Sequence, residues 1–170
     1  MPRTVWGPLS GLGLIAALLV CLADQASKLW ILKVFNLADR GIVHVAPFVD
    51  LVLTWNTGIS YGWFQQEGPL GQGALLAFKA VAVALLWLWL AHSHSRLAAL
   101  SLGLIIGGAI GNAIDRLLHG AVVDFVMLYV ETATWRFDWY VFNLADVAIV
   151  AGVVGLLYES LTGDSAPKAP

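Results

Sequence analysis

The sequence predicts an all-α integral membrane protein with four transmembrane helices, a small extracytoplasmic β-rich platform and an interfacial loop. Hydrophobic residues make up 59% of the chain and charged residues 12%, and the mean hydropathy of +0.80 exceeds that of a soluble domain. The 170 residues provide about four spans of roughly 20 residues each. We therefore expect one membrane-embedded domain over residues 1–162 and a disordered tail over residues 163–170.

The first predicted span covers about residues 9–32. Arg3 precedes it and Cys21 lies within it, as in a cleavable lipoprotein signal. However, the apolar run continues past Cys21 to Trp30 and the rest of the chain is also apolar, so we expect a retained span. A single cysteine excludes an intramolecular disulfide framework.

Three more apolar runs, about residues 70–92, 97–118 and 140–161, are each long enough to cross about 30 Å of hydrocarbon. Four spans place both termini on one side of the membrane. The cationic connection 92–96 and Arg3 assign that side to the cytoplasm. The formal net charge of -2 gives no electrostatic footprint for nucleic acid.

The two longer connections are rich in β-branched and aromatic residues, which predicts short strands at about 43–45, 49–55 and 122–126. Aromatic side chains are typical of a membrane boundary. Those in or beside these connections are Trp55, Tyr61, Trp63, Trp135, Trp139 and Tyr140. The sequence therefore predicts an interfacial platform.

Polar residues in the spans gather at the outer ends of the helices. Ionisable side chains at membrane depth are expensive and mark functional sites. The cluster comprises Asp24 and Lys28 from span one, Asn112, Asp115 and Arg116 from span three, Asn143 and Asp146 from span four, and Asp124 just before it. Lys79 in span two is the exception, and we expect it to extend its ammonium toward the outer interface.

Asp124 and Asp146 come from separate elements and suit acid and base work on one water molecule. Two carboxyls close together in a poorly solvated site favour one shared proton. The ionised member takes a proton from water while the other polarises a carbonyl. A structural ion pair with Arg116 or Lys28 would explain the same carboxylates, so both interpretations stay open.

Small residues in span three predict close helix packing. Gly103, Gly107 and Gly111 recur at four-residue intervals, with Gly108 beside them. Such residues let helix backbones approach closely. The spacing predicts a tight bundle around the polar cluster.

Five motifs in order along nearly the whole chain resemble bacterial lipoprotein signal peptidase, also called signal peptidase II. They are Asp24-Gln25-Ala26-Ser27-Lys28, Asn56-Thr57-Gly58, the segment 107–112 followed by Asp115-Arg116, Val122-Val123-Asp124-Phe125, and Phe142-Asn143-Leu144-Ala145-Asp146. The resemblance implies an aspartyl endopeptidase of the bacterial inner membrane, with its site toward the extracytoplasmic face. Its substrates would be diacylglyceryl-modified prolipoproteins, cut before the lipidated cysteine.

The resemblance also implies roles for individual residues. Asp124 and Asp146 match the catalytic pair. Positions that shape the site or hold substrate are matched by Asn56, Gly108, Asn112, Arg116, Asn143 and Ala145, and supporting positions by Asp24, Lys28 and Asp115. The resemblance implies no metal or organic cofactor. Separately, we expect membrane lipids to surround a monomer, and residues 56–68 to form a lid over the site, because Gly58, Gly62 and Gly68 permit movement.

Other interpretations remain alongside this one. The segment 35–39 repeats the five letters of 142–146, but it leads into no apolar span, so we interpret Asp39 as a solvated loop residue. Ser27 beside Lys28 could serve a serine enzyme. A proton-coupled carrier would need a polar path across the bilayer, and a purely structural protein would tolerate Asp to Asn changes.

Overall fold

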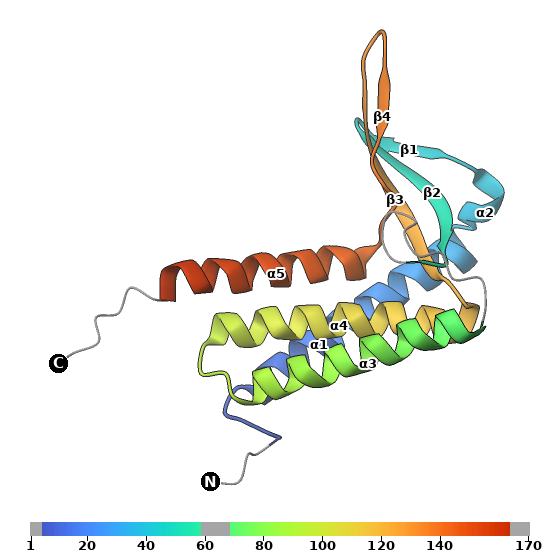
Figure 1. Ribbon diagram of the computed structural model, residues 1–170. Helices are drawn as coiled ribbons and strands as arrows, with labels where there is room; N and C mark the ends of the chain where they lie inside the picture. The colour runs from blue at the N-terminus through green and yellow to red at the C-terminus, as the bar shows by residue number, and fades with distance from the viewer. Residues whose placement is uncertain (1–4, 59–68, 164–170) are drawn as a thin grey trace.

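The computed structural model describes residues 5–58 and 69–163 and has four long helices with an antiparallel sheet at one end (Figure 1). The helices are α1, Ser10–Leu29, continued by the π-helical turn η1, Trp30–Val34; α3, Pro69–Ala91; α4, Arg96–His119; and α5, Leu144–Gly163. In the described part of the chain, four helical segments are long and apolar enough to cross a membrane. The predicted fold class is confirmed.

The fourth helix begins at Leu144, whereas the sequence placed the start of that span near residue 140. The preceding residues are extended because Phe142 pairs with a strand: its N–H donates to the Val126 carbonyl at 2.9 Å, and Val126 returns the bond at 2.9 Å. Hydropathy does not distinguish such an apolar extended segment from the first turn of a helix.

Helix α4 is the centre of the bundle and packs against α1, α3 and α5. A Cβ at Gly103 or Gly107 would lie 2.4 Å from a backbone oxygen of α1, and one at Gly108 would lie 2.5 Å from the Ala145 oxygen of α5. Glycine thus lets α4 contact two helices closely, on two faces, as its spacing predicted.

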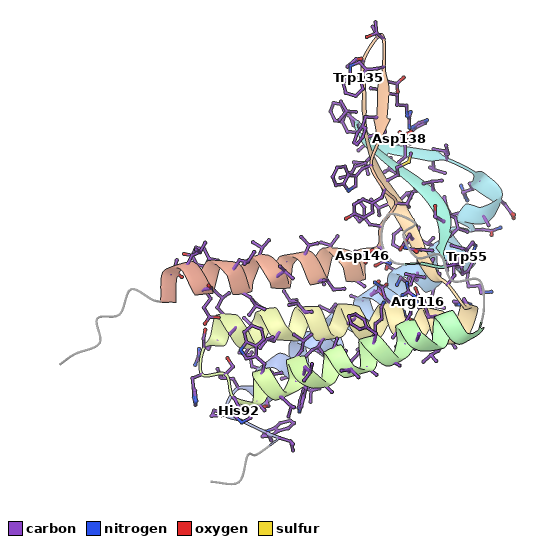
Figure 2. All side chains as sticks on the ribbon, in the orientation of Figure 1. Trp55, His92, Arg116, Trp135, Asp138 and Asp146 are labelled. Carbon is purple, nitrogen blue, oxygen red and sulfur yellow. The ribbon has the colours of Figure 1, made fainter. Side chains whose placement is uncertain are left out.

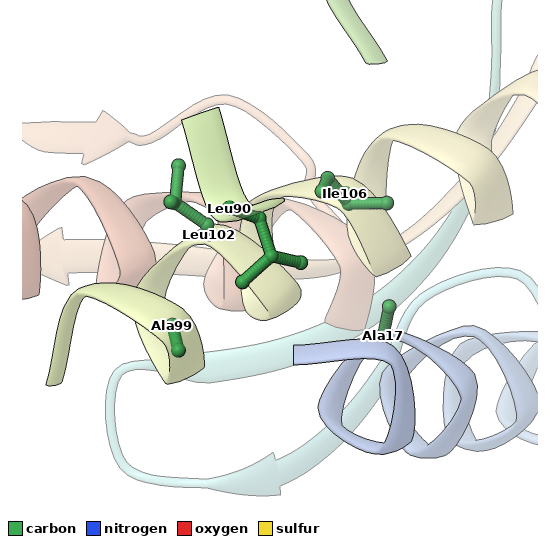
Figure 3. Packing of buried hydrophobic residues seen from close by; sticks show 5 residues of the cluster. All are labelled: Ala17, Leu90, Ala99, Leu102 and Ile106. Atoms are coloured by element: carbon green, nitrogen blue, oxygen red, sulfur yellow. The ribbon is translucent and has the colours of Figure 1, made fainter. Parts of the chain in front are cut away.

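An apolar core holds the half of the bundle distant from the sheet. Figure 3 shows its five buried side chains, from α1, α3 and α4: Ala17, Leu90, Ala99, Leu102 and Ile106. The outward faces of the helices are apolar as well, with Leu22, Leu85 and Leu157 each at least 59% exposed. Such surfaces suit hydrocarbon and would aggregate in water.

The sheet has the order β1-β2-β3-β4, with every neighbouring pair antiparallel. Its strands are β1, Val43–Ala46; β2, Val49–Asn56; β3, Val122–Glu131; and β4, Arg136–Asp138. The three predicted strands are confirmed, but β3 continues five residues beyond the predicted end and pairs with β4, which the sequence did not predict. The β3–β4 hairpin stands away from the bundle, across the direction of the long helices (Figure 1).

A second apolar cluster joins the sheet to the end of the first helix. Ile31 of η1 and Leu37 of the short helix α2, Leu37–Arg40, pack with Val123 and Phe125 of β3. Asp39 lies in α2 and is exposed, so it is solvated as predicted but belongs to a helical turn rather than a loop. This cluster fixes the sheet over one end of the bundle.

Candidate active site

Asp124 and Asp146 lie where the sheet meets the bundle. Asp124, on β3, is 2% exposed. Asp146 is half-buried in the first turn of α5, at the end of that helix next to the sheet (Figure 2). Both line one cavity of about 220 Å³. Its other lining residues are Asn56, Leu75, Phe78, Lys79, Asn112, Arg116, Val122 and Ile149. Two carboxyl groups from distant parts of the chain thus share one cavity.

Asn143 and Asp146 cap the first turn of α5 reciprocally. The Asp146 N–H donates to Asn143 Oδ1 at 3.1 Å, and the Asn143 N–H donates to Asp146 Oδ2 at 3.1 Å. Two N–H groups of the helix start, which have no partner within the helix, are satisfied in this way. The cap also fixes the direction in which the Asp146 carboxyl points.

The two aspartates are linked through neutral amides. Asn143 Nδ2 donates to Asp124 Oδ1 at 2.6 Å, Asn112 Nδ2 donates to Asp146 Oδ1 at 3.0 Å, and Asn143 Nδ2 also donates to Asn112 Oδ1 at 3.0 Å. Asn56 Nδ2 donates to the second oxygen of Asp124 at 3.1 Å. The hydrogen bonds recorded for the described residues include none directly between the two carboxyls.

Burial raises the pKa of Asp124 to about 6, from an ordinary value of 3.8. The negative charge of Asp146 acts in the same direction, while the hydrogen bonds from Asn56 and Asn143 oppose the rise. A carboxyl with a pKa in this range exchanges a proton near neutral pH, as acid and base catalysis requires.

Behind the cavity, Lys28 is 3% exposed and holds two buried carboxylates. Its Nζ lies 2.8 Å from Asp24 Oδ2 and 2.7 Å from Asp115 Oδ2, and donates to Asn112 Oδ1 at 3.1 Å. Gln25 Nε2 also donates to Asp115 Oδ1, at 2.9 Å. Buried charges need such complete pairing, because an unpaired one is costly.

Each of these supporting carboxylates holds the backbone next to one member of the pair. Asp115 Oδ2 accepts from the Val123 N–H at 3.0 Å, one residue before Asp124. Asp24 Oδ1 accepts from the Ala145 N–H at 3.0 Å, one residue before Asp146. The Lys28 cluster therefore positions both aspartates through the main chain.

Arg116 closes the side of the cavity near the end of β2. Its Nη2 donates to the Gly58 carbonyl at 2.6 Å, and its Nη1 to the Asn112 carbonyl at 3.4 Å. Its Nε is buried without an acceptor among the described residues. Asn56 Oδ1 accepts from the Gly58 N–H at 3.1 Å, which orients the amide that reaches Asp124.

The structure brings all the predicted site residues to one end of the bundle. Asn56, Asn112, Arg116, Asp124 and Asp146 line the cavity. Asn143 lies between the two aspartates, the cluster of Asp24, Lys28 and Asp115 lies behind them, and Gly108 and Ala145 form the α4–α5 contact.

Two residues of the site were missing from the predicted set. Gln25 lies in the first of the five motifs, but no role was predicted for it. An amide next to a carboxylate in an apolar span would have indicated a hydrogen bond between charged groups and their neighbours. Lys79 lines the cavity that holds the aspartates, which its isolated position in an apolar run did not reveal. Beyond Gly58, the predicted lid and the aromatic residues Tyr61 and Trp63 lie outside the described residues.

Comparison with solved structures gives the same fold. A bacterial membrane enzyme solved by the in meso method at 2.3 Å resolution superposes with a TM-score of 0.76, covering 94% of each chain at 24% sequence identity. A second such structure, at 1.9 Å resolution, gives a TM-score of 0.71 over 89% of this chain and 94% of the other.

Comparison by sequence gives closer relatives. The chain is 63% identical to a lipoprotein signal peptidase of Nitrobacter hamburgensis, over 93% of this chain and 96% of the relative. It is 61% identical to a lipoprotein signal peptidase of Rhodopseudomonas palustris, over 94% of this chain and 97% of the relative. The family model for signal peptidase (SPase) II matches residues 16–162. With the predicted motifs gathered around one cavity in this fold, the chain belongs to the signal peptidase II family.

Proposed function

We propose that this protein is an aspartic endopeptidase that removes the signal peptide from diacylglyceryl-modified prolipoproteins, cleaving before the lipidated cysteine. The observation that carries the proposal is the shared cavity, which Asp124 and Asp146 both line from different elements. Family membership supports the peptidase activity and the prolipoprotein substrate. The raised pKa of Asp124, about 6, supports the acid and base chemistry.

In the proposed mechanism the two carboxyls share one proton. The ionised carboxylate takes a proton from a water molecule, whose oxygen attacks the scissile carbonyl carbon, while the protonated carboxyl donates to the carbonyl oxygen. The tetrahedral intermediate then collapses and the C–N bond breaks. The departing amine takes up the proton that came from water, and the proton on the former carbonyl oxygen returns to the carboxylate that donated it. Asn112 and Asn143 keep the carboxyls oriented because each donates to one aspartate.

The proposed substrate reaches the cavity from the lipid phase. The cavity lies at the sheet end of a bundle whose outer faces are apolar, so a signal peptide can approach sideways while its acyl chains remain in the bilayer. We place the sheet on the extracytoplasmic face of the inner membrane and both termini in the cytoplasm. Labelling with an impermeant thiol reagent tests this orientation: a cysteine at Thr132 should react in intact spheroplasts, and one at His94 only after lysis.

The decisive experiment is cleavage of a diacylglyceryl-modified prolipoprotein by the purified protein in detergent. Asp124→Asn and Asp146→Asn should each lower kcat by about 10³-fold or more, since each removes a group that must exchange a proton. Asp39→Asn is a matched control, because it changes the same letter of the same pentapeptide at an exposed position, and it should retain full activity.

Each alternative has its own outcome in this experiment. Activity that survives in either active-site variant, with folding and yield matched, would remove that aspartate from the chemistry. If the wild-type protein cleaved nothing but exchanged protons or ions in sealed vesicles, the carrier interpretation would replace the peptidase. Cleavage of the unlipidated precursor at an equal rate would contradict the substrate assignment alone.

A further inference from the structure

Lys79 is the single charged residue of α3. It lies ten residues into the helix from Pro69, about 15 Å along the axis. A lysine at such depth in an apolar span is costly and calls for a function. Its half-buried side chain lines the cavity that Asp124 and Asp146 share, so this charge belongs to the candidate active site.

Among residues 5–58 and 69–163, the elements packed around the cavity contribute seven charged side chains to the cavity and to the Lys28 cluster behind it. The carboxyl groups are Asp24 of α1, Asp115 of α4, Asp124 of β3 and Asp146 of α5; the cations are Lys28 of α1, Lys79 of α3 and Arg116 of α4. Negative charges exceed positive ones by one when every group is ionised. One proton on the aspartate pair makes the set neutral, but only if Lys79 is counted.

The other two cations do not replace Lys79. Lys28 is already bound between Asp24 and Asp115, at 2.8 and 2.7 Å. Arg116 contributes one charge at the cavity, and its Nη atoms donate to the carbonyls of Gly58 and Asn112. Without Lys79 the neutral state would need a second proton on the pair, and a doubly protonated pair has no base to activate water.

The apolar surroundings strengthen the effect of this one charge. Lys79 also lines a groove of about 340 Å³ between α3 and α4, whose other lining residues are all apolar, among them Leu76, Ala80 and Ile110. A charge at the boundary between an apolar groove and a polar cavity is screened less than a charge in water.

We propose that Lys79 is a positioning residue that keeps the Asp124–Asp146 pair in its singly protonated, active state. The inference rests on the proposed function, because it assigns a control over that same pair. Lys79 does so from α3, a helix that supplies no other charge.

The test is the pH profile of lipopeptide cleavage by the full-length protein in detergent, from pH 5 to 9, with kcat and kcat/KM measured separately. Removing a nearby cation disfavours the ionised carboxylate. In Lys79→Met the acid limb of the kcat profile should therefore move to higher pH, by about one pH unit. Lys79→Arg keeps the charge and should keep the wild-type profile.

Lys33→Met is the matched control, since Lys33 is exposed on η1 at the same end of the bundle but is not part of the cavity lining. Its profile should not move. A loss in Lys79→Met that is equal at all pH values, a rise in KM alone, or an unchanged profile would each overturn the inference. These results leave the peptidase proposal intact, because only the Asp124→Asn and Asp146→Asn variants decide it.

Discussion

Asp50 and Asp124 are two buried aspartates on neighbouring strands of one sheet. Asp50 pairs with basic side chains, whereas Asp124 pairs with neutral amides. Asp50 is fully buried and pairs with His44 Nδ1 at 2.6 Å and Arg136 Nη2 at 3.2 Å. Asp124 is 2% exposed, and within the described residues its carboxyl accepts hydrogen bonds from the amides of Asn56 and Asn143 alone. The two side chains are about equally buried, so the charge of their hydrogen-bond partners is what distinguishes them.

A cationic partner keeps a carboxylate ionised, which suits a permanent structural link. Neutral amides orient a carboxyl without fixing its charge, so it can take up and release a proton. The comparison suggests a general criterion for this fold: a buried aspartate with only amide partners, beside a second carboxyl and a cavity, is the one to test for catalysis.

The largest expected difference between the two residues is in catalysis. Asp124→Asn should abolish turnover, while Asp50→Asn should keep kcat within about tenfold of wild type, because it alters the platform without changing a proton-exchanging group. Initial rates with matched amounts of folded protein measure both. A loss as large in Asp50→Asn as in Asp124→Asn would show that the criterion fails.

The second-largest expected effect comes from removing the Asn143 amide. Asn143→Ala removes the cap of α5 and the donor to Asp124, so we expect kcat to fall by about 10²-fold and stability to fall by about 1 kcal/mol. Ser95→Ala is the control, since it removes a cap at the other end of the bundle, where Ser95 Oγ accepts from Ala98 N–H at 3.3 Å. It should lose similar stability and no activity.

The pH dependence of stability gives a second test of Asp124. Folding raises the pKa of Asp124 from 3.8 to about 6, so the folded state binds this proton more tightly. This proton stabilises the folded state by at most about 3 kcal/mol. The stabilisation is complete below about pH 4 and is lost as the pH rises through 6. Thermal unfolding in detergent should show this loss in wild type and not in Asp124→Asn. An identical slope in the two proteins would contradict the raised pKa.

The smallest expected effect is at the edge of the platform. Arg136→Gln removes the cationic partner of Asp50, but the Arg136 side chain is 33% exposed, so water screens the pair. We expect a small loss of stability that shrinks in high salt, with no change in the pH profile of cleavage. A change in that profile would link the platform to the active site.

The sequence predicted the parts of this molecule that depend on local pattern. Continuous apolar runs identify the spans, and the spacing of Asn112 and Arg116, or of Asn143 and Asp146, places each pair on one side of its helix. The side chain of Lys79 was not predictable in the same way, because α3 is apolar all round and no periodicity shows which face meets the bundle. Strand β4 and the late start of α5 depend on pairing with β3, which is a tertiary contact.

The bond from the Ala145 N–H to Asp24 joins residues 121 positions apart in the chain. Helix α1 thus holds the start of α5, and Asp146 follows one residue later. Asp124 and Asp146 therefore come together only in a chain whose α5 has packed against α1. We expect the hydrolysis proposed above only after that contact has formed.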